Sequence, residues 1–114
     1  QQYDQMLGGF PLQLPRVGAG NISAFHLYVI CLRHNATPKG HRRVFDSLRE
    51  QGIGVNLHYM PVYLQPYYRN LGFSPGICPE AERYASGAIS LPIFPGLSMQ
   101  DQGRVVTALG NTLL

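Results

Sequence analysis

Lysine is almost absent from this chain, which has Lys39 as its single lysine in 114 residues. Charged residues of all kinds are scarce, at 13% of the sequence against about 25% in typical soluble proteins. Lys39 stands in the turn Thr-Pro-Lys-Gly near two arginines, which offers no apolar pocket to activate an amine for Schiff-base chemistry. We therefore expect Lys39 to be a solvated surface residue. The low charge predicts a surface that is neutral and polar, or one that is partly covered by another part of a protein.

Other absences argue against several classes of protein. The net charge of +3 is modest, and Arg42-Arg43 is the only adjacent basic pair, whereas a nucleic-acid-binding domain carries a basic stripe. None of the four histidines stands at metal-ligand spacing from another histidine or from a cysteine. Gly18-Ala-Gly20 lacks the third glycine of a dinucleotide-binding loop. The longest apolar run is far too short to span a bilayer. We expect no nucleic acid, metal or membrane as a partner.

Two cysteines, Cys31 and Cys78, are too few for a disulfide framework. Cys31 lies inside an apolar run and is expected to be buried, and Cys78 stands just before a predicted helix. We expect two free thiols in a reducing compartment, the cytoplasm. The chain has the length of one small domain. It begins Gln1-Gln2-Tyr3, which suggests a fragment of a longer protein, although tag removal or processing would give the same start.

Hydrophobic runs and turn residues predict a small α/β (α+β) domain in which helices pack on a three-stranded sheet. Residues 1–8 should be the end of a helix, and residues 10–23, rich in proline and glycine, an irregular connector before the domain at 24–114. Strands are expected at Ala24–Arg33, Ile53–Tyr59 and Ala88–Phe94. The first strand is continuously apolar, so both of its faces should be covered.

Capping residues predict where the other helices start and end. A threonine or serine before a first turn can accept a backbone N–H, proline suits the first turn, and glycine suits the residue after the last turn. The predicted helix boundaries, in chain order, are Thr37-Pro38 to Gly52, Pro66 to Gly72, Pro79 onward, and Ser98 with Asp101 onward.

The most distinctive stretch is 52–73, GIGVNLHYMPVYLQPYYRNLGF. It contains a histidine, four of the seven tyrosines, a glutamine and an arginine. Many hydrogen-bonding rings with little charge suit a polar, ring-shaped ligand such as a sugar. The candidate binding residues are His58, Tyr59, Tyr63, Gln65, Tyr67 and Arg69.

Each of these assignments has a structural alternative. His58 ends a predicted strand beside a proline-rich loop, where a functional and an ordinary side chain are equally expected. On a short helix only one of Tyr67 and Tyr68 can face a ligand, and Arg69 can form a surface salt bridge instead of holding a phosphate. The other histidines are expected to be structural or solvated and two further tyrosines to be core residues: His26, His34 and His41, and Tyr28 and Tyr84.

Three blocks of sequence carry a family resemblance: HLYVICL, then RRVFDSLREQGIGVNLHYMPVYLQPYYRNLGF, then PEAERYASGAISLPIFPGLSMQDQGRVVTAL. In this order and spacing they resemble the C-terminal domain of the DegT/DnrJ/StrS sugar aminotransferases, from about Tyr3 to the end of the chain. Within that family the blocks are most similar to transaminases of the pseudaminic acid pathway, which make UDP-4-amino-4,6-dideoxy-N-acetyl-β-L-altrosamine from a 4-keto sugar nucleotide.

The resemblance implies a homodimeric fold-type I enzyme that uses pyridoxal 5′-phosphate (PLP) and takes an amino group from an amino acid, glutamate by analogy. It also implies that the Schiff-base lysine and the phosphate cradle belong to a large N-terminal domain with no counterpart in these residues. This chain would then be the small domain that holds the nucleotide sugar, with His58 and Tyr59 toward the cleft and residues 60–65 along it. No catalytic residue is expected in the chain itself, so the chain alone should be inactive.

One position departs from the family pattern, because Tyr63 stands where relatives often have histidine. Tyrosine donates and accepts a hydrogen bond but does not titrate near neutral pH, so the sugar and any acid–base role at this position are left open. Two rival readings remain, a non-catalytic α/β module that binds a small molecule or a protein, and a nucleic-acid-binding sandwich. A domain taken from a larger enzyme should expose an apolar patch where its partner domain lies, and a self-contained module should not.

Overall fold

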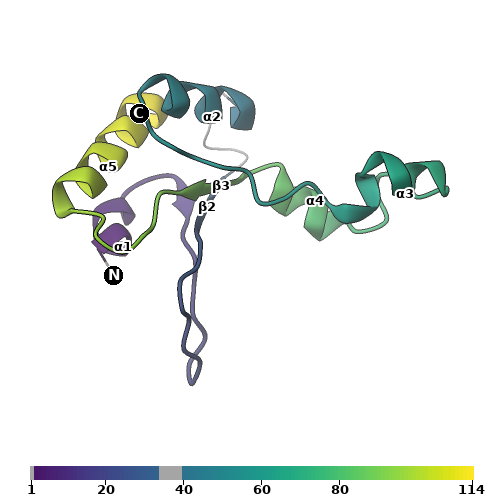
Figure 1. The fold of residues 1–114 in the computed structure, drawn as a ribbon, viewed down its shortest axis with the longest axis horizontal. Helices are drawn as coiled ribbons and strands as arrows, with labels where there is room; N and C mark the ends of the chain where they lie inside the picture. The colour runs from purple at the N-terminus through teal and green to yellow at the C-terminus, as the bar shows by residue number, and fades with distance from the viewer. Residues whose placement is uncertain (1, 34–39) are drawn as a thin grey trace.

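The computed structural model describes residues 2–33 and 40–114 (Figure 1). Within these residues β1, β2 and β3 form an antiparallel sheet of three strands in that order, which agrees with the predicted fold class. The elements in chain order are α1 (Gln2–Leu7), β1 (Leu12–Gln13), β2 (Tyr28–Leu32), α2 (Gly40–Glu50), the 3-10 turn η1 (Val62–Leu64), α3 (Pro66–Asn70), α4 (Pro79–Ala85), β3 (Ala88–Leu91) and α5 (Met99–Leu113).

The strand predicted at Ile53–Tyr59 is wrong, because this segment makes a single bridge, Asn56 to Ser90. The two residues exchange backbone hydrogen bonds of 3.2 and 2.8 Å. The next carbonyl on that edge of β3 is that of Ala88, and it accepts from His41 Nε2 at 2.9 Å. The ladder therefore stops after one pair, and residues 57–59 form no further backbone pair with β3.

The third strand is instead β1, which lies in the segment predicted as an irregular connector. Leu12 pairs with Leu32 and Gln13 with Cys31. Pro11 and Pro15 flank this strand, and because proline has no N–H to give to a ladder, they limit it to two residues. Residues 2–23 therefore add a helix and a strand to the same packed unit, while the division at residue 23 stays a prediction.

One face of β2 is only partly covered within the described residues, contrary to the prediction from the apolar run. Burial alternates along β2, so that Tyr28, Ile30 and Leu32 are buried while Val29 and Cys31 are only half-buried. Cys31 is therefore less buried than expected. Strand β2 is also shorter than predicted, and the residues before it belong to an extended loop. We call the side of the sheet that carries Val29 and Cys31 the outer face.

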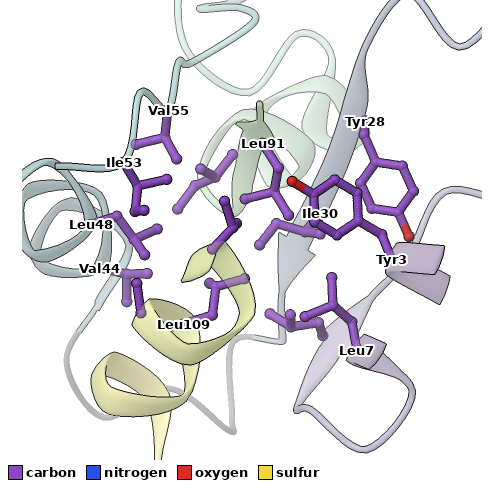
Figure 2. Close-up of a cluster of buried hydrophobic side chains, with 14 of the residues drawn as sticks. Tyr3, Leu7, Tyr28, Ile30, Val44, Leu48, Ile53, Val55, Leu91 and Leu109 are labelled. Carbon is purple, nitrogen blue, oxygen red and sulfur yellow. The ribbon is translucent and has the colours of Figure 1, made fainter. Parts of the chain in front are cut away.

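The core lies on the other side of the sheet, where α1, α2, α5 and residues 53–55 converge on β2 and β3 (Figure 2). Helix α2 contributes Val44 and Leu48 and helix α5 contributes Leu109, all fully buried. The predicted caps are confirmed at both helices: Gly52 has φ +78° after α2, and Ser98 Oγ accepts the Asp101 N–H at 3.0 Å before α5. These side chains supply the apolar burial that holds the small sheet.

Two tyrosines fasten α1 to the sheet. Tyr3 donates its hydroxyl to the Pro92 carbonyl at 2.9 Å, and Tyr28 donates to Asp4 Oδ1 at 2.6 Å. The two rings are 4.9 Å apart between centroids. Burial raises the pKa of Tyr3 to about 12 and also raises that of Tyr28, while the hydrogen bond from Tyr28 lowers the pKa of Asp4. Tyr28 is thus the core residue that the sequence predicts.

Some predictions on individual residues have other outcomes. Tyr84 is not a core residue, because 43% of its surface is exposed. His26 is exposed, which agrees with the expectation that it is structural or solvated. His41 is half-buried and forms a structural hydrogen bond. The predictions for His34, Lys39 and the Thr37-Pro38 helix start fall outside the described residues.

Two parts of the chain extend away from the packed unit (Figure 1). We call residues 57–85, which include α3 and α4, the arm, and residues 14–27, between β1 and β2, the loop. The radius of gyration of 15.4 Å exceeds the ~13 Å expected of a compact domain of this length. Both parts expose large apolar side chains, with Ile22 of the loop fully exposed. The exposed apolar residues of the arm include Leu57, Met60, Val62, Leu71, Phe73 and Ile77.

Candidate functional site

His58 lies over the outer face of the sheet, where it meets a buried serine. Its Nδ1 is 2.8 Å from Ser90 Oγ. Ser90 is 4% exposed and His58 half-buried. The Asn56–Ser90 bridge fixes the backbone two residues before the histidine. The imidazole is therefore held at one nitrogen by a fixed partner, and no other hydrogen bond is found for its other nitrogen among the described residues.

A cavity of about 480 Å³ opens beside this pair, which we call the His58 cavity. Its polar lining includes His58, Ser90 and Asn56, and its apolar lining includes Leu27 and Ile93. Ligand pockets commonly have volumes of roughly 300–1,000 Å³ and place a few polar groups on an apolar surface. The cavity therefore has the size and the lining for a sugar-sized ligand.

Tyr59 lies beside His58 but faces a neighbouring hollow. The two rings meet edge to face with centroids 4.6 Å apart, and Tyr59 is 72% exposed. Both residues line a second cavity of about 340 Å³, together with Met60 and Pro61. His58 thus stands between two hollows, and the structure brings the predicted pair His58 and Tyr59 together at their rim.

Tyr63 is engaged within the arm. Its hydroxyl donates to Glu82 in a short hydrogen bond and accepts the Cys78 N–H at 3.3 Å. Glu82 Oε1 also accepts the Gly76 N–H at 2.6 Å. These bonds lower the pKa of Glu82, first through the Tyr63 hydroxyl and then through Gly76. Desolvation first, and the Glu82 bond second, raise the pKa of Tyr63. The Tyr63 hydroxyl therefore staples η1 to α4.

The three remaining candidates lie at α3, toward the end of the arm (Figure 1). Gln65 precedes the helix and its side chain makes no capping bond. Tyr67 is 68% exposed, and its ring meets that of Tyr68 at 5.2 Å between centroids. Arg69 is exposed as well. The described structure does not bring these residues into the His58 cavity, so their role in binding stays a prediction.

Two partners of the candidates were not predicted from the sequence. Ser90 is the only polar residue in the run AISLPIF, and a buried hydroxyl there needs a hydrogen-bond partner, which is a signal that could have pointed to it. Glu82 gives no such signal, because an acid in a first helical turn already has an ordinary explanation. Within residues 2–33 and 40–114 no group of three or more metal-ligating side chains gathers, and no helix is long and apolar enough to cross a membrane.

The sequence from residue 1 to residue 110 matches the DegT/DnrJ/EryC1/StrS aminotransferase family. This chain belongs to that family. Solved structures of aminotransferases match it over nearly its whole length. It is 25% identical to Helicobacter pylori PseC, an aminotransferase involved in pseudaminic acid biosynthesis, with a TM-score of 0.84 over 98% of this chain and 30% of that one.

Two further solved structures agree with this match. DesV from S. venezuelae, determined with a ketimine intermediate, is 28% identical with a TM-score of 0.83 over 96% of this chain and 29% of that one. A DegT DnrJ EryC1 StrS aminotransferase from Brucella abortus is 28% identical with a TM-score of 0.78 over 98% of this chain and 28% of that one. The chain thus spans less than a third of the length of these relatives, and the fold predicted from the resemblance is confirmed.

Proposed function

We propose that this chain is the C-terminal, sugar-facing domain of a PLP-dependent nucleotide-sugar aminotransferase. The observation that carries the proposal is the match of almost all of this chain to less than a third of each solved aminotransferase. The full protein would transfer an amino group from an amino acid, glutamate by analogy, to a UDP-4-keto sugar in the cytoplasm, as a homodimer. The likeness to PseC favours a UDP-4-amino-4,6-dideoxy-N-acetyl-β-L-altrosamine product.

The exposed apolar surface supports an origin in a larger protein. The arm and the loop leave large apolar side chains in solvent, among them Ile22, Met60 and Leu71. A self-contained domain covers most of such surface, and contiguous exposed apolar patches usually mark an interaction site. A self-contained binding module, which is the rival interpretation, should expose no such apolar surface.

The described residues do not provide an attachment site for PLP. Resting PLP enzymes hold the cofactor through a lysine amine, and residues 2–33 and 40–114 contain no lysine. We therefore assign the cofactor to the rest of the full protein and derive no chemical step through it here. The contribution of this chain is to bind and orient the sugar, with His58 fixed by Ser90 as the central group.

An absorbance spectrum of the full-length protein tests this proposal. With PLP bound, a sugar aminotransferase should show the band of lysine-bound cofactor, and glutamate should convert it to the pyridoxamine form. The band requires a Schiff-base lysine, which we assign to the rest of the full protein. Absence of the band would mean that the full protein lacks this lysine as well. That result would refute the aminotransferase assignment and favour a dehydratase-like or non-catalytic role.

The role of His58 needs a second measurement. His58→Ala in the full-length protein should lower sugar turnover while the rate of the glutamate half-reaction, followed by the same spectrum, stays normal. If both half-reactions are normal per folded molecule, His58 does not bind the sugar. Ala is a suitable replacement because His58 is only half-buried and its removal leaves the Asn56–Ser90 backbone bridge in place.

A further inference from the structure

The outer face of the sheet holds another cavity, of about 700 Å³, between the base of the loop and α4. We call it the arginine pocket. Leu27, Val29 and Cys31 give it an apolar surface, and Tyr84 of α4 lines it as well. Val29 and Cys31 are only half-buried, and the pocket occupies the partly covered side of β2 on which they lie.

Three arginines from three separate segments line this pocket: Arg16 from the loop, Arg33 just after β2, and Arg83 from α4. Its lining residues, all within the described chain, include no aspartate or glutamate. Arg83 pairs with Glu80 three residues away, in an exposed pair of the kind that contributes little. Arg16 makes no hydrogen bond or ion pair with the residues that the structure describes. Three guanidinium groups around one hollow create a positive potential that favours a ligand with more than one negative charge.

The lining and the volume of the pocket indicate which class of anion it can bind. Guanidinium groups bind phosphate oxygens in pairs of parallel hydrogen bonds, and two linked phosphates would satisfy more than one arginine. The 43% exposed ring of Tyr84 offers an aromatic face on which a base can stack. The volume of about 700 Å³ is far larger than a lone phosphate ion or a free amino acid requires.

The arginine pocket and the His58 cavity are neighbours, because Leu27 lines both of them. One extended ligand can therefore reach from one to the other across the outer face. We propose that the arginine pocket binds the nucleoside diphosphate part of a nucleotide sugar, with the phosphates on Arg16 and Arg83 and the base against Tyr84, while the sugar lies in the His58 cavity. The choice of a nucleotide sugar as ligand rests on the proposed function.

Alkylation of Cys31 tests whether UDP occupies the arginine pocket. Its thiol lines the arginine pocket, whereas Cys78 is exposed on the arm and does not. We would alkylate the full-length protein with and without UDP and measure modification of each cysteine by peptide mass spectrometry. UDP should slow modification of Cys31 and leave Cys78 unchanged. Equal rates at Cys31 with and without saturating UDP would overturn the proposal.

Charge variants give a second, independent measurement. Arg16→Gln in the full-length protein should weaken UDP binding, followed by calorimetry, about tenfold, because it removes a charge-assisted contact. Arg16→Lys should retain part of the affinity. Arg49→Gln is the matched control, because Arg49 is exposed on α2, which packs on the opposite face, and this variant should bind UDP normally. Equal affinity in wild type and Arg16→Gln, or an equal loss in Arg49→Gln, would overturn the assignment.

Two further probes locate the parts of the ligand. Tyr84→Leu should weaken UDP binding but not binding of inorganic pyrophosphate, because only UDP carries a base. If an acidic partner protein occupied the arginines instead, UDP would neither bind nor protect Cys31, and the proposal would fail. UDP binding that depends on the arginines, in a protein without a lysine-bound PLP band, would support the pocket and refute the proposed function. A normal PLP band together with UDP binding that does not depend on the arginines would support the proposed function and refute the pocket.

Discussion

Replacing Ser90 with alanine isolates the contact that orients His58. The substitution removes the hydroxyl that lies 2.8 Å from His58 Nδ1 and leaves the two backbone hydrogen bonds between Ser90 and Asn56 intact. Because the methyl group of alanine occupies nearly the same space, the packing of β3 should not change. Any effect on His58 then comes from the lost hydrogen bond.

The expected cost in stability is small. One net hydrogen bond contributes about 1 kcal/mol to the free energy of unfolding, and the nitrogen that loses its partner belongs to the half-buried His58, which lines an open cavity. For a domain of this size such a change lowers the melting temperature by about 4 °C. The orientation of the imidazole ring should change more than the stability does, because Ser90 is the one hydrogen-bond partner found for His58 within the described residues.

Histidine nitrogen NMR spectra of the chain measure this effect directly. Ser90→Ala should shift the Nδ1 and Nε2 resonances of His58, which His58→Gln would assign by their disappearance. In the full-length protein the same variant should slow sugar turnover more than the glutamate half-reaction. Ser47→Ala is the control, because it removes a hydrogen bond of 3.0 Å to Thr112 between α2 and α5 and should cost similar stability without moving the His58 resonances. Unchanged His58 resonances in Ser90→Ala would refute the argument.

Two further predictions concern the core and the arm. Leu109→Ala removes a fully buried side chain between α5 and the sheet and should lower the free energy of unfolding by about 3 kcal/mol, measured by urea denaturation; a loss below about 1 kcal/mol would mean that α5 does not complete this core. Acid should loosen the arm, because a carboxylate whose folded pKa is lowered stabilises the fold above its ordinary pKa, 4.5 for Glu82, and this contribution is lost as the pH falls below that value. Hydrogen exchange at the Gly76 amide should therefore gain protection as the pH rises through this range, beyond the intrinsic change in exchange rate, and Glu82→Gln should abolish the gain; a Glu82→Gln profile identical to wild type would contradict the staple.

The helices could be predicted from the sequence because their signals are local. Gly52, Pro79 and Ser98 each specify a helix end through their own backbone preference or side chain, and the structure places helix ends at all three. The sheet was harder to predict, because pairing depends on residues far apart in the sequence. No short sequence pattern shows that His41 hydrogen-bonds to the Ala88 carbonyl. This bond ends the pairing with β3 that residues after Gly54 would otherwise continue.

The covering of the sheet could not be predicted either. The apolar run around Val29 and Cys31 indicated that both faces are covered. The sequence does not show whether the residues that cover an apolar side chain belong to the same chain. The same reasoning explains Tyr84, whose aromatic ring suits a core and a binding surface equally. His58 and Tyr59 could be singled out from the sequence, whereas the arginine pocket is assembled from the loop, the end of β2 and α4, which only the fold brings together.

The fastening of α1 has a mechanical consequence. Tyr3 holds the Pro92 carbonyl and Tyr28 holds Asp4, so the helix at the start of the described chain cannot turn without carrying the sheet. A force applied at α1 would be passed through these two hydrogen bonds to β2 and to the residue that follows β3. Loss of either tyrosine hydroxyl would therefore loosen α1 from the sheet.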